Sequence, residues 1–438
     1  MALAIILRLG VWILVPDTRF ASDEQGYVQA GSTLAETGDQ DLFWPPLTGW
    51  LVALVKTLQP AAPLSAIRLL WIAMDIGCVL AVRVLARRTA VALFGSTPQR
   101  VGRYTTLATA GYAVYLPAIS HAQFVTSETP ALLQLLAGLV LLTAPNAGVT
   151  TYAVAGIVTG TLVLTRPSLM PLLILLPAAA SYSSWRRSGA RLAAIFVVAG
   201  VLPIGAVVAR NWITVGEPTI SHNAAYNLYI GNQDLYAEDL NLFRPMATPE
   251  QIEFRRQYFS GELQYPALSP AEFQREGMAW IGRHPVTFVR RAVGRLARVF
   301  VPKTDVLELA GGERVAGVFT PAAMALLLAA NLQWTAILFG GIVGLVWIYR
   351  AGPGPGRIYL AALAGSLALC VIAISKPRYS FMFDPLLILG VVAVAMAPRE
   401  VFAGLTRADR RWLAAAWAFF AWGWVAWLIF AVSSRASL

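Results

Sequence analysis

Two adjacent carboxylates, Asp23 and Glu24, follow the first apolar segment of the chain, in the stretch "RFASDEQGYVQAG". Tyr27 comes one helical turn after Asp23, and the chain returns to apolar residues from Trp44 onward. A loop fixed at both ends against apolar surface can hold a carboxylate in a partly dehydrated cleft, which makes it more basic and suits it to accept a proton from a hydroxyl. The pattern favours a general base, and a solvated surface loop is the alternative.

A third carboxylate, Glu128, stands at the start of an apolar segment in "SETPALLQLL". Its position suits a second acid that faces the same cleft. It equally suits a helix N-terminal carboxylate, with Ser127 or Thr126 as the capping residue. Asp75 lies in the middle of another apolar segment, where we expect a structural hydrogen bond to a neighbouring helix.

Three arginines, Arg166, Arg210 and Arg378, stand at the ends of apolar segments, and Lys376 and Tyr379 accompany the last of them. The planar guanidinium matches the oxygens of a phosphate group and stays charged at any working pH. We therefore predict that these five residues bind a phosphate. The alternative for each arginine is a side chain that extends along apolar surface to reach water.

The segment "ISHNAAYNLYIGNQD" could hydrogen-bond a sugar or phosphate through His222, Asn223 and Asn232, as Tyr27 could in the first loop. It could equally be a tight loop built on Asn and Gly turns. The three histidines have no metal-ligand spacing, and no P-loop or dinucleotide fingerprint is present. We predict no metal and no other cofactor, with a bound divalent cation as the alternative.

The elements that must position these residues are membrane-spanning helices. The chain is 57% hydrophobic and 13% charged, against about one-quarter charged in a soluble domain. Apolar stretches of about 18 residues recur along it, so we predict an all-α polytopic membrane protein with about eleven transmembrane helices. They fall at about 2–16, 67–85, 104–119, 129–143, 150–165, 168–183, 192–209, 328–349, 358–375, 384–397 and 412–432.

The basic residues predict the orientation of these helices. The net charge of +11 comes mainly from arginine clusters that anchor cytoplasmic loops, so we predict no nucleic-acid partner. We expect one integrated transmembrane domain over 1–438. The acidic pair then lies in a first outer loop, 17–66, and a long outer loop, 210–327, follows later. Both loops contain segments with the pattern of amphipathic interfacial helices. The first helix is short and contains Arg8, which either extends toward water or marks an upstream start.

Several of these stretches together resemble the polytopic GT-C glycosyltransferases. The likeness is greatest to the branch with the protein O-mannosyltransferases and the lipid A aminoarabinose transferase. It rests on Asp23, Glu24 and Tyr27 with the following "PPL", on "SE" at 127–128 and on "TRP" at 165–167. It continues with "ARNW" and "NLYIGN" within 209–232 and with "PRYSFMFDP" at 377–385.

The resemblance implies an inverting enzyme of the cytoplasmic membrane. Such enzymes transfer a sugar from a polyprenyl-phosphate donor to a hydroxyl of a lipid, glycan or protein acceptor on the outer face. Asp23 would be the base, Glu24 or Glu128 would assist it, and the arginines would hold the departing lipid phosphate. A secondary transporter or lipid flippase remains the alternative, and a non-catalytic membrane scaffold is a third possibility.

Overall fold

The computed structural model describes most of the chain. The described residues are 1–15, 20, 23–182, 188–233, 242–243, 246, 248–250, 252–253, 257, 268–309, 314–315, 318–352 and 354–433. Arg186 and Arg187 lie outside the described residues. The same is true of 16–19 and 21–22, which belong to the end of the first predicted helix and the start of the first outer loop.

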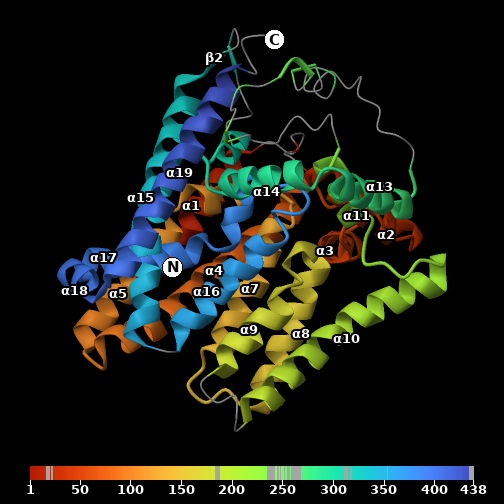
Figure 1. The fold of residues 1–438 in the computed structure, drawn as a ribbon. Coiled ribbons are helices and arrows are strands. Elements are labelled where there is room, and N and C mark those ends of the chain that lie inside the picture. The colour runs from red at the N-terminus through yellow and green to blue at the C-terminus, as the bar shows by residue number, and fades with distance from the viewer. Residues whose placement is uncertain are drawn as a thin grey trace. The chain divides into compact units, whose positions relative to one another are not determined.

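Almost all of the described residues are in helices, as Figure 1 shows. The helices of the first half are α1 (Ala2–Leu14), α2 (Glu24–Thr37), α3 (Pro46–Leu58), α4 (Leu64–Phe94), α5 (Pro98–Ala113), α6 (Leu116–His121), α7 (Glu128–Leu142), α8 (Val149–Thr165), η1 (Pro167–Leu169), α9 (Leu172–Ser181) and α10 (Ala190–Val215). The remaining ones are α11 (Asn223–Gly231), α13 (Pro270–Arg283), α14 (Pro285–Val299), η4 (Asp305–Glu308), α15 (Pro321–Ala351), α16 (Pro355–Ala368), η5 (Pro377–Met382), α17 (Asp384–Met396), α18 (Pro398–Gly404) and α19 (Arg407–Ser433). Two short strands, β1 (Arg314–Val315) and β2 (Val318–Phe319), pair antiparallel.

Proline and glycine set several helix boundaries. Helices α3 and α14 begin at Pro46 and Pro285, where the missing N–H has no intrahelical partner to lose. Helices α2 and α10 end at Gly38 and Gly216, whose φ values of 79° and 77° are in the left-handed region that closes a helix. These signals are local in the sequence, which explains why the element positions are predictable.

The predicted all-α membrane fold is confirmed. Each predicted span overlaps helix, with three departures: 104–119 divides into α5 and α6, 168–183 overlaps η1 and α9, and 358–375 extends beyond the end of α16 at Ala368. Among the described residues, four helices are long and apolar enough to cross a membrane, namely α4, α10, α15 and α19. Helices α17 and α18 form a fifth candidate that bends by 106°, and the other apolar helices are shorter. The count of eleven spans stays a prediction.

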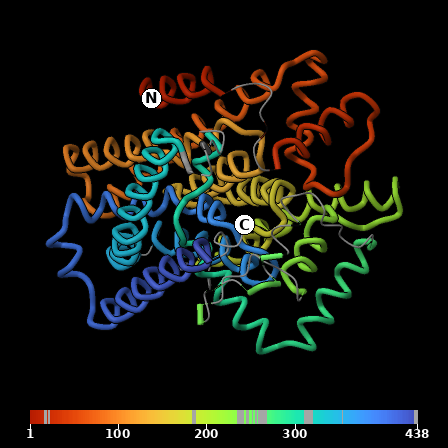
Figure 2. The backbone as a smooth tube through the Cα atoms, turned by 90° about the horizontal axis from the view of Figure 1, so that it is seen from above, coloured from red at the N-terminus to blue at the C-terminus, as the bar shows by residue number. Residues whose placement is uncertain are grey.

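The chain divides into two compact units, each of which is described by itself. Unit 1 comprises Met1–Ser221, Lys303–Ser366 and Phe381–Arg410, and unit 2 comprises His222–Pro302, Leu367–Ser380 and Arg411–Leu438. In unit 1, α8 and α10 run side by side in Figure 1, and α2 packs against α3. Figure 2 shows the same helices from above, with α2 and α3 in red to orange and α8 and α10 in yellow to yellow-green.

Small residues allow the long contact between α8 and α10. Gly156 and Gly160 are spaced by four, and a Cβ on either one would overlap the backbone of α10 at Phe196 or Gly200. Close backbone approach of this kind is how helices pack inside a bilayer, where burial from water supplies no driving force. The spacing therefore supports a membrane environment for this pair.

Arg8 of α1 is fully buried, and it forms an ion pair with Asp75 of α4. The guanidinium also donates to the carbonyl oxygen of Ala113 at 2.6 Å, and Asp75 accepts a hydrogen bond of 2.7 Å from Tyr112. The expected structural hydrogen bond of Asp75 to a neighbouring helix is therefore present. Arg8 does not extend toward water: its charge is neutralised inside the bundle.

In unit 2, Arg295 of α14 is buried, whereas Arg290 of the same helix is exposed. Arg295 is 1% exposed and donates to the carbonyl oxygens of Val371 and Ile372 at 3.3 and 2.9 Å. The outward residues of the same helix are Val286, Val289 and Val293, which are 64%, 58% and 36% exposed. The helix is amphipathic, as predicted, and the described residues of unit 2 leave these valines exposed.

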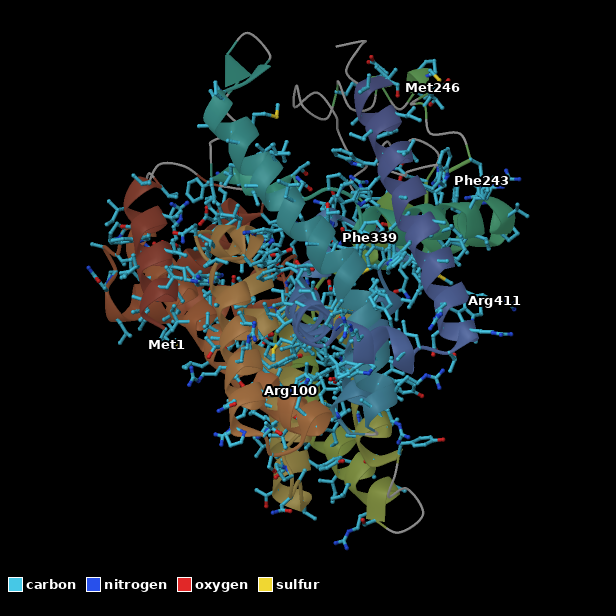
Figure 3. All side chains as sticks on the ribbon, turned by 90° about the vertical axis from the view of Figure 1, so that its left-hand side faces the viewer. Met1, Arg100, Phe243, Met246, Phe339 and Arg411 are labelled. Atoms are coloured by element: carbon cyan, nitrogen blue, oxygen red, sulfur yellow. The ribbon has the colours of Figure 1, made fainter. Side chains whose placement is uncertain are left out.

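Charged pairs also occur at the surface of unit 1. Arg100 of α5, labelled in Figure 3, lies 2.9 Å from a carboxylate oxygen of Glu400 in α18. Both side chains are about half exposed, so the pair contributes only about 0–1 kcal/mol to stability.

Candidate active site in the first loop

The two adjacent carboxylates of the first loop have different surroundings. Glu24 is fully buried, and its carboxylate accepts two hydrogen bonds from Arg68 of α4, at 3.0 and 2.8 Å. It accepts a third, of 2.8 Å, from the backbone N–H of Val125. A carboxylate with these three donors and no exposure is well placed to fix the loop and badly placed to receive a substrate proton.

Apolar packing completes the attachment of the loop. Tyr27, Val52, Ile67, Trp71 and Val125 belong to one buried cluster, which joins α2, α3, α4 and the link before α7. The indole N–H of Trp71 donates to the carbonyl oxygen of Thr126 at 2.8 Å. The start of α2 and the start of α7 are therefore fastened to the same end of α4.

This attachment brings three predicted site residues together around Tyr27, which is 4% exposed. Its side chain is hydrogen-bonded to Ser127 and is influenced by the charges of Asp23, Glu128 and Arg166. Burial, together with the nearby carboxylate of Asp23, raises the pKa of the Tyr27 hydroxyl far above its usual value. The phenol therefore stays protonated and can act only as a neutral hydrogen-bonding group.

Arg166 and Glu128 form a buried ion pair beside this tyrosine. Nη1 of Arg166 lies 2.8 Å from Oε1 of Glu128 and donates to Oγ of Ser127 at 3.3 Å. Glu128 is the first residue of α7, and Ser127 makes no side-chain cap there. Arg166 follows the last residue of α8, so the pair also joins α7 to α8.

Asp23 is the partly exposed member of the group. It precedes the first residue of α2, and its carbonyl oxygen accepts a hydrogen bond from the N–H of Tyr27 at 3.3 Å. The carboxylate is thus held at the end of a helix whose first turn is packed against α4. Of the two acids in the pair, this one can meet a ligand.

Arg210, near the end of α10, is the second predicted arginine of unit 1 after Arg166. Its guanidinium donates to the side-chain oxygen of Gln40, in the loop between α2 and α3. This arginine is partly buried and stands beside the first loop.

The other predicted site residues belong to unit 2. Asn232 is 1% exposed and uses its amide in full: it donates to Leu228 and Ile372 and accepts from Arg295. Little of this side chain remains for a ligand. Asn223 accepts a hydrogen bond of 2.7 Å from Asn227 of the same helix. The roles predicted for His222, Lys376, Arg378 and Tyr379, which are all partly buried, stay predictions.

The sequence analysis missed a buried polar network in unit 1. Nζ of Lys303 lies 3.0 Å from Oδ2 of Asp384, which also accepts a hydrogen bond of 2.9 Å from Tyr115. Nearby, Nε2 of His121 lies 2.9 Å from Oδ2 of Asp305. The sequence contained a signal for both residues of the Lys303–Asp384 pair. Lysine is rare in this chain, and Asp384 stands at the start of an apolar segment, where an acid is costly to bury.

Burial alone would raise the pKa of Asp305, but His121 and Lys303 reverse the effect. The hydrogen bond and charge of His121, with the charge of Lys303, hold the pKa of the Asp305 carboxyl at about 2. Within the described part of the chain, no group of three or more His, Cys, Asp or Glu side chains could hold a metal ion.

The solved structures that are similar to this chain include the following two. The first is the archaeal oligosaccharyltransferase AglB from Archaeoglobus fulgidus, in complex with an inhibitory peptide and a dolichol-phosphate. It is 12% identical with a TM-score of 0.45, and the match covers 99% of this chain and 55% of that one. The second is ArnT from Cupriavidus metallidurans in the apo state, at 16% identity, a TM-score of 0.37 and coverage of 90% and 77%.

Both neighbours are GT-C glycosyltransferases, the class that the sequence resembles. This chain spans little more than half the length of the oligosaccharyltransferase. No family model and no curated protein matches the sequence. At these identities and TM-scores, the activity of this chain has to be argued from its own side chains.

Proposed function

We propose that this protein is a membrane-embedded, inverting glycosyltransferase. It moves a sugar from a polyprenyl-phosphate donor to an acceptor hydroxyl at the outer face of the cytoplasmic membrane. The observation that carries the proposal is the group around Tyr27, where Asp23, Glu128 and Arg166 come together from three separate segments. A carboxylate that can meet a ligand, beside a buried acid–guanidinium pair, suits a reaction that moves a proton and releases an anion.

The reaction is a single displacement at the anomeric carbon. The acceptor oxygen attacks this carbon, and its proton passes to the carboxylate of Asp23. The bond between the anomeric carbon and the phosphate oxygen breaks, and its electron pair leaves with the lipid phosphate. Because attack and departure occur on opposite faces of the sugar, the configuration inverts.

The departing phosphate needs positive charge, and Arg166 alone supplies little of it. Its ion pair with Glu128 already neutralises much of the guanidinium. We therefore assign Arg166 to positioning and to partial charge stabilisation. Arg210 remains the predicted phosphate ligand in the same unit as this group, and the roles of Lys376, Arg378 and Tyr379 stay predictions. Loss of a single electrostatic contact of this kind typically costs about 2.7–4 kcal/mol of barrier.

The setting in the membrane explains the donor class. In the part of the chain that the structure describes, four helices are long and apolar enough to span a bilayer, and the sequence contains no nucleotide-phosphate motif. Nucleotide sugars are not available outside the cytoplasmic membrane, so a donor carried on a lipid solves the supply problem. Such a donor reaches the active site within the plane of the membrane.

One observation that favoured a transporter has another explanation. Asp75 was the acid inside a predicted span, and such acids often mark transport pathways. In this structure it is buried with Arg8 and Tyr112 as partners. A neutralised and fully enclosed acid of this kind is poorly suited to bind and release an ion.

The test is a transfer assay on Asp23→Asn in phospholipid nanodiscs, with a panel of polyprenyl-phosphate sugars as donors and delipidated envelope extract as acceptor. Loss of the base should lower turnover by about 10²–10⁴-fold. Glu36→Gln removes an exposed carboxylate from the same helix and serves as the matched control. NMR of the product should show the inverted anomer. Transfer at the wild-type rate by Asp23→Asn, or retention of configuration, contradicts the proposal.

A further inference from the structure

A pocket of about 310 Å³ lies between α2 and the loop that leads to α3. It is lined by Gly26, Gln29, Ala30, Thr33, Asp39, Gln40, Asp41 and Trp44. This volume is at the lower end of the range for small-molecule sites, about 300–1,000 Å³, so it suits a group the size of a sugar ring and not a lipid chain.

One wall of the pocket is an aromatic ring in a fixed position. The ring of Trp44 packs against Tyr27, with 4.6 Å between the ring centroids, and its indole lies directly over Gly26. Any Cβ at position 26 would overlap the indole. A rigid aromatic face presents apolar surface to the C–H face of a ligand without losing side-chain freedom on binding.

The polar lining consists mainly of hydrogen-bond acceptors and amides. The side-chain nitrogen of Gln40 is buried and has no hydrogen-bond partner among the described residues, while its oxygen accepts from Arg210. Asp41 is oriented by the backbone N–H of Phe43, which donates to it at 2.7 Å. Asp39, Gln29 and Thr33 add a carboxylate, an amide and a hydroxyl.

We propose that this pocket binds an uncharged sugar ring of the acceptor, an inference that rests on the proposed function. The ring stacks on Trp44, its hydroxyls donate to Asp39 and Asp41, and the amide of Gln40 donates to a ring or hydroxyl oxygen. Asp39 and Asp41 repel a phosphate, so the lining favours an uncharged ring, and Arg210 contacts the pocket only through the side-chain oxygen of Gln40.

The location of the pocket fits this assignment. Gly26 is three residues after Asp23 in the first turn of α2, a rise of about 4.5 Å along the helix axis. A sugar held against Trp44 therefore lies within one helical turn of the proposed base. The pocket and the base are parts of the same helix, which fixes the distance between the acceptor hydroxyl and the carboxylate.

Direct binding tests the inference separately from transfer. The probe is a set of methyl hexopyranosides, observed by saturation-transfer NMR on the protein in phospholipid nanodiscs, since glycoside detergents carry a competing sugar. Gln29→Ala and Asp39→Asn each remove one hydrogen-bonding group and should weaken binding roughly three- to tenfold. Gln25→Ala and Glu36→Gln are the matched controls, because both residues are exposed on α2 and do not line the pocket.

Binding that weakens in the two pocket variants, and stays within twofold of wild type in the two controls, supports the inference. Binding no stronger than that of glycerol, or equal binding in all variants, overturns it. A hydroxyl-bearing peptide that binds where the glycosides do not also overturns it. Asp23→Asn should still bind the glycoside while its turnover falls by about 10²–10⁴-fold, so failure of the inference and failure of the proposed function give different results.

Discussion

Replacing each of the neighbouring acids Asp23 and Glu24 by its amide should have different effects. The change at Glu24 should lower the free energy of unfolding, whereas the change at Asp23 should lower the rate of transfer. Glu24→Gln removes the charge opposite Arg68, which is 1% exposed. The amide can keep the bond from Val125, but its NH₂ group then faces the Nη2 donor that now lies 2.8 Å from Oε2. Removing one partner of a buried ion pair typically costs about 3–5 kcal/mol, and we expect a loss of unfolding free energy near the lower end, about 3 kcal/mol.

Asp23→Asn should leave the unfolding free energy within about 0.5 kcal/mol of wild type, because Asp23 is partly exposed. The measurement is equilibrium unfolding in mixed zwitterionic and SDS micelles, followed by tryptophan fluorescence. The double variant Glu24→Gln with Arg68→Met removes the uncompensated charge and should recover most of the loss. If Glu24→Gln were as stable as wild type and lost transfer as completely as Asp23→Asn, Glu24 would be the base and our division of roles would be wrong.

Three further changes test other parts of the structure. Arg166→Lys keeps the charge beside Glu128 but loses the planar fork, so we expect a fall in kcat/KM of about tenfold in the transfer assay with unchanged folding. Gly156→Leu places a side chain into the backbone of α10 and should destabilise unit 1 by more than about 3 kcal/mol, whereas Gly148→Leu, with open space around it, should not. Asp305 has a pKa of about 2, below the usual value near 4. Its contribution to stability should therefore be complete above about pH 4 and disappear toward pH 2, and the difference in unfolding free energy between wild type and Asp305→Asn should shrink over that interval.

The positions of the helices were predictable because their signals are local. Runs of apolar residues, proline in the first turn and glycine after the last one are all read within a few residues of the boundary. The amphipathic pattern of α14 was equally visible. Which side of that helix faces inward was not, because the carbonyl groups that bind Arg295 belong to residues 371–372, more than seventy positions away.

The same limit applies to the candidate site. The sequence singled out Asp23, Glu128 and Arg166 by residue type, and the structure brings them to one tyrosine. Only the family resemblance gave Asp23 and Glu24 different tasks, and the residues alone could not, because the partner of Glu24 is Arg68, 44 positions along the chain. Long-range pairs between charged side chains leave no periodic pattern in a single sequence.

The buried pair between Arg8 and Asp75 has a consequence for the order in which the protein is built. When α1 leaves the ribosome, α4 has not yet been synthesised, and Arg8 has no acid to neutralise it. An isolated arginine at the centre of an apolar helix opposes membrane insertion by about 2.5–3.5 kcal/mol. Arg8 is therefore neutralised only once α4 has been made, so α1 settles against the rest of the bundle after α4.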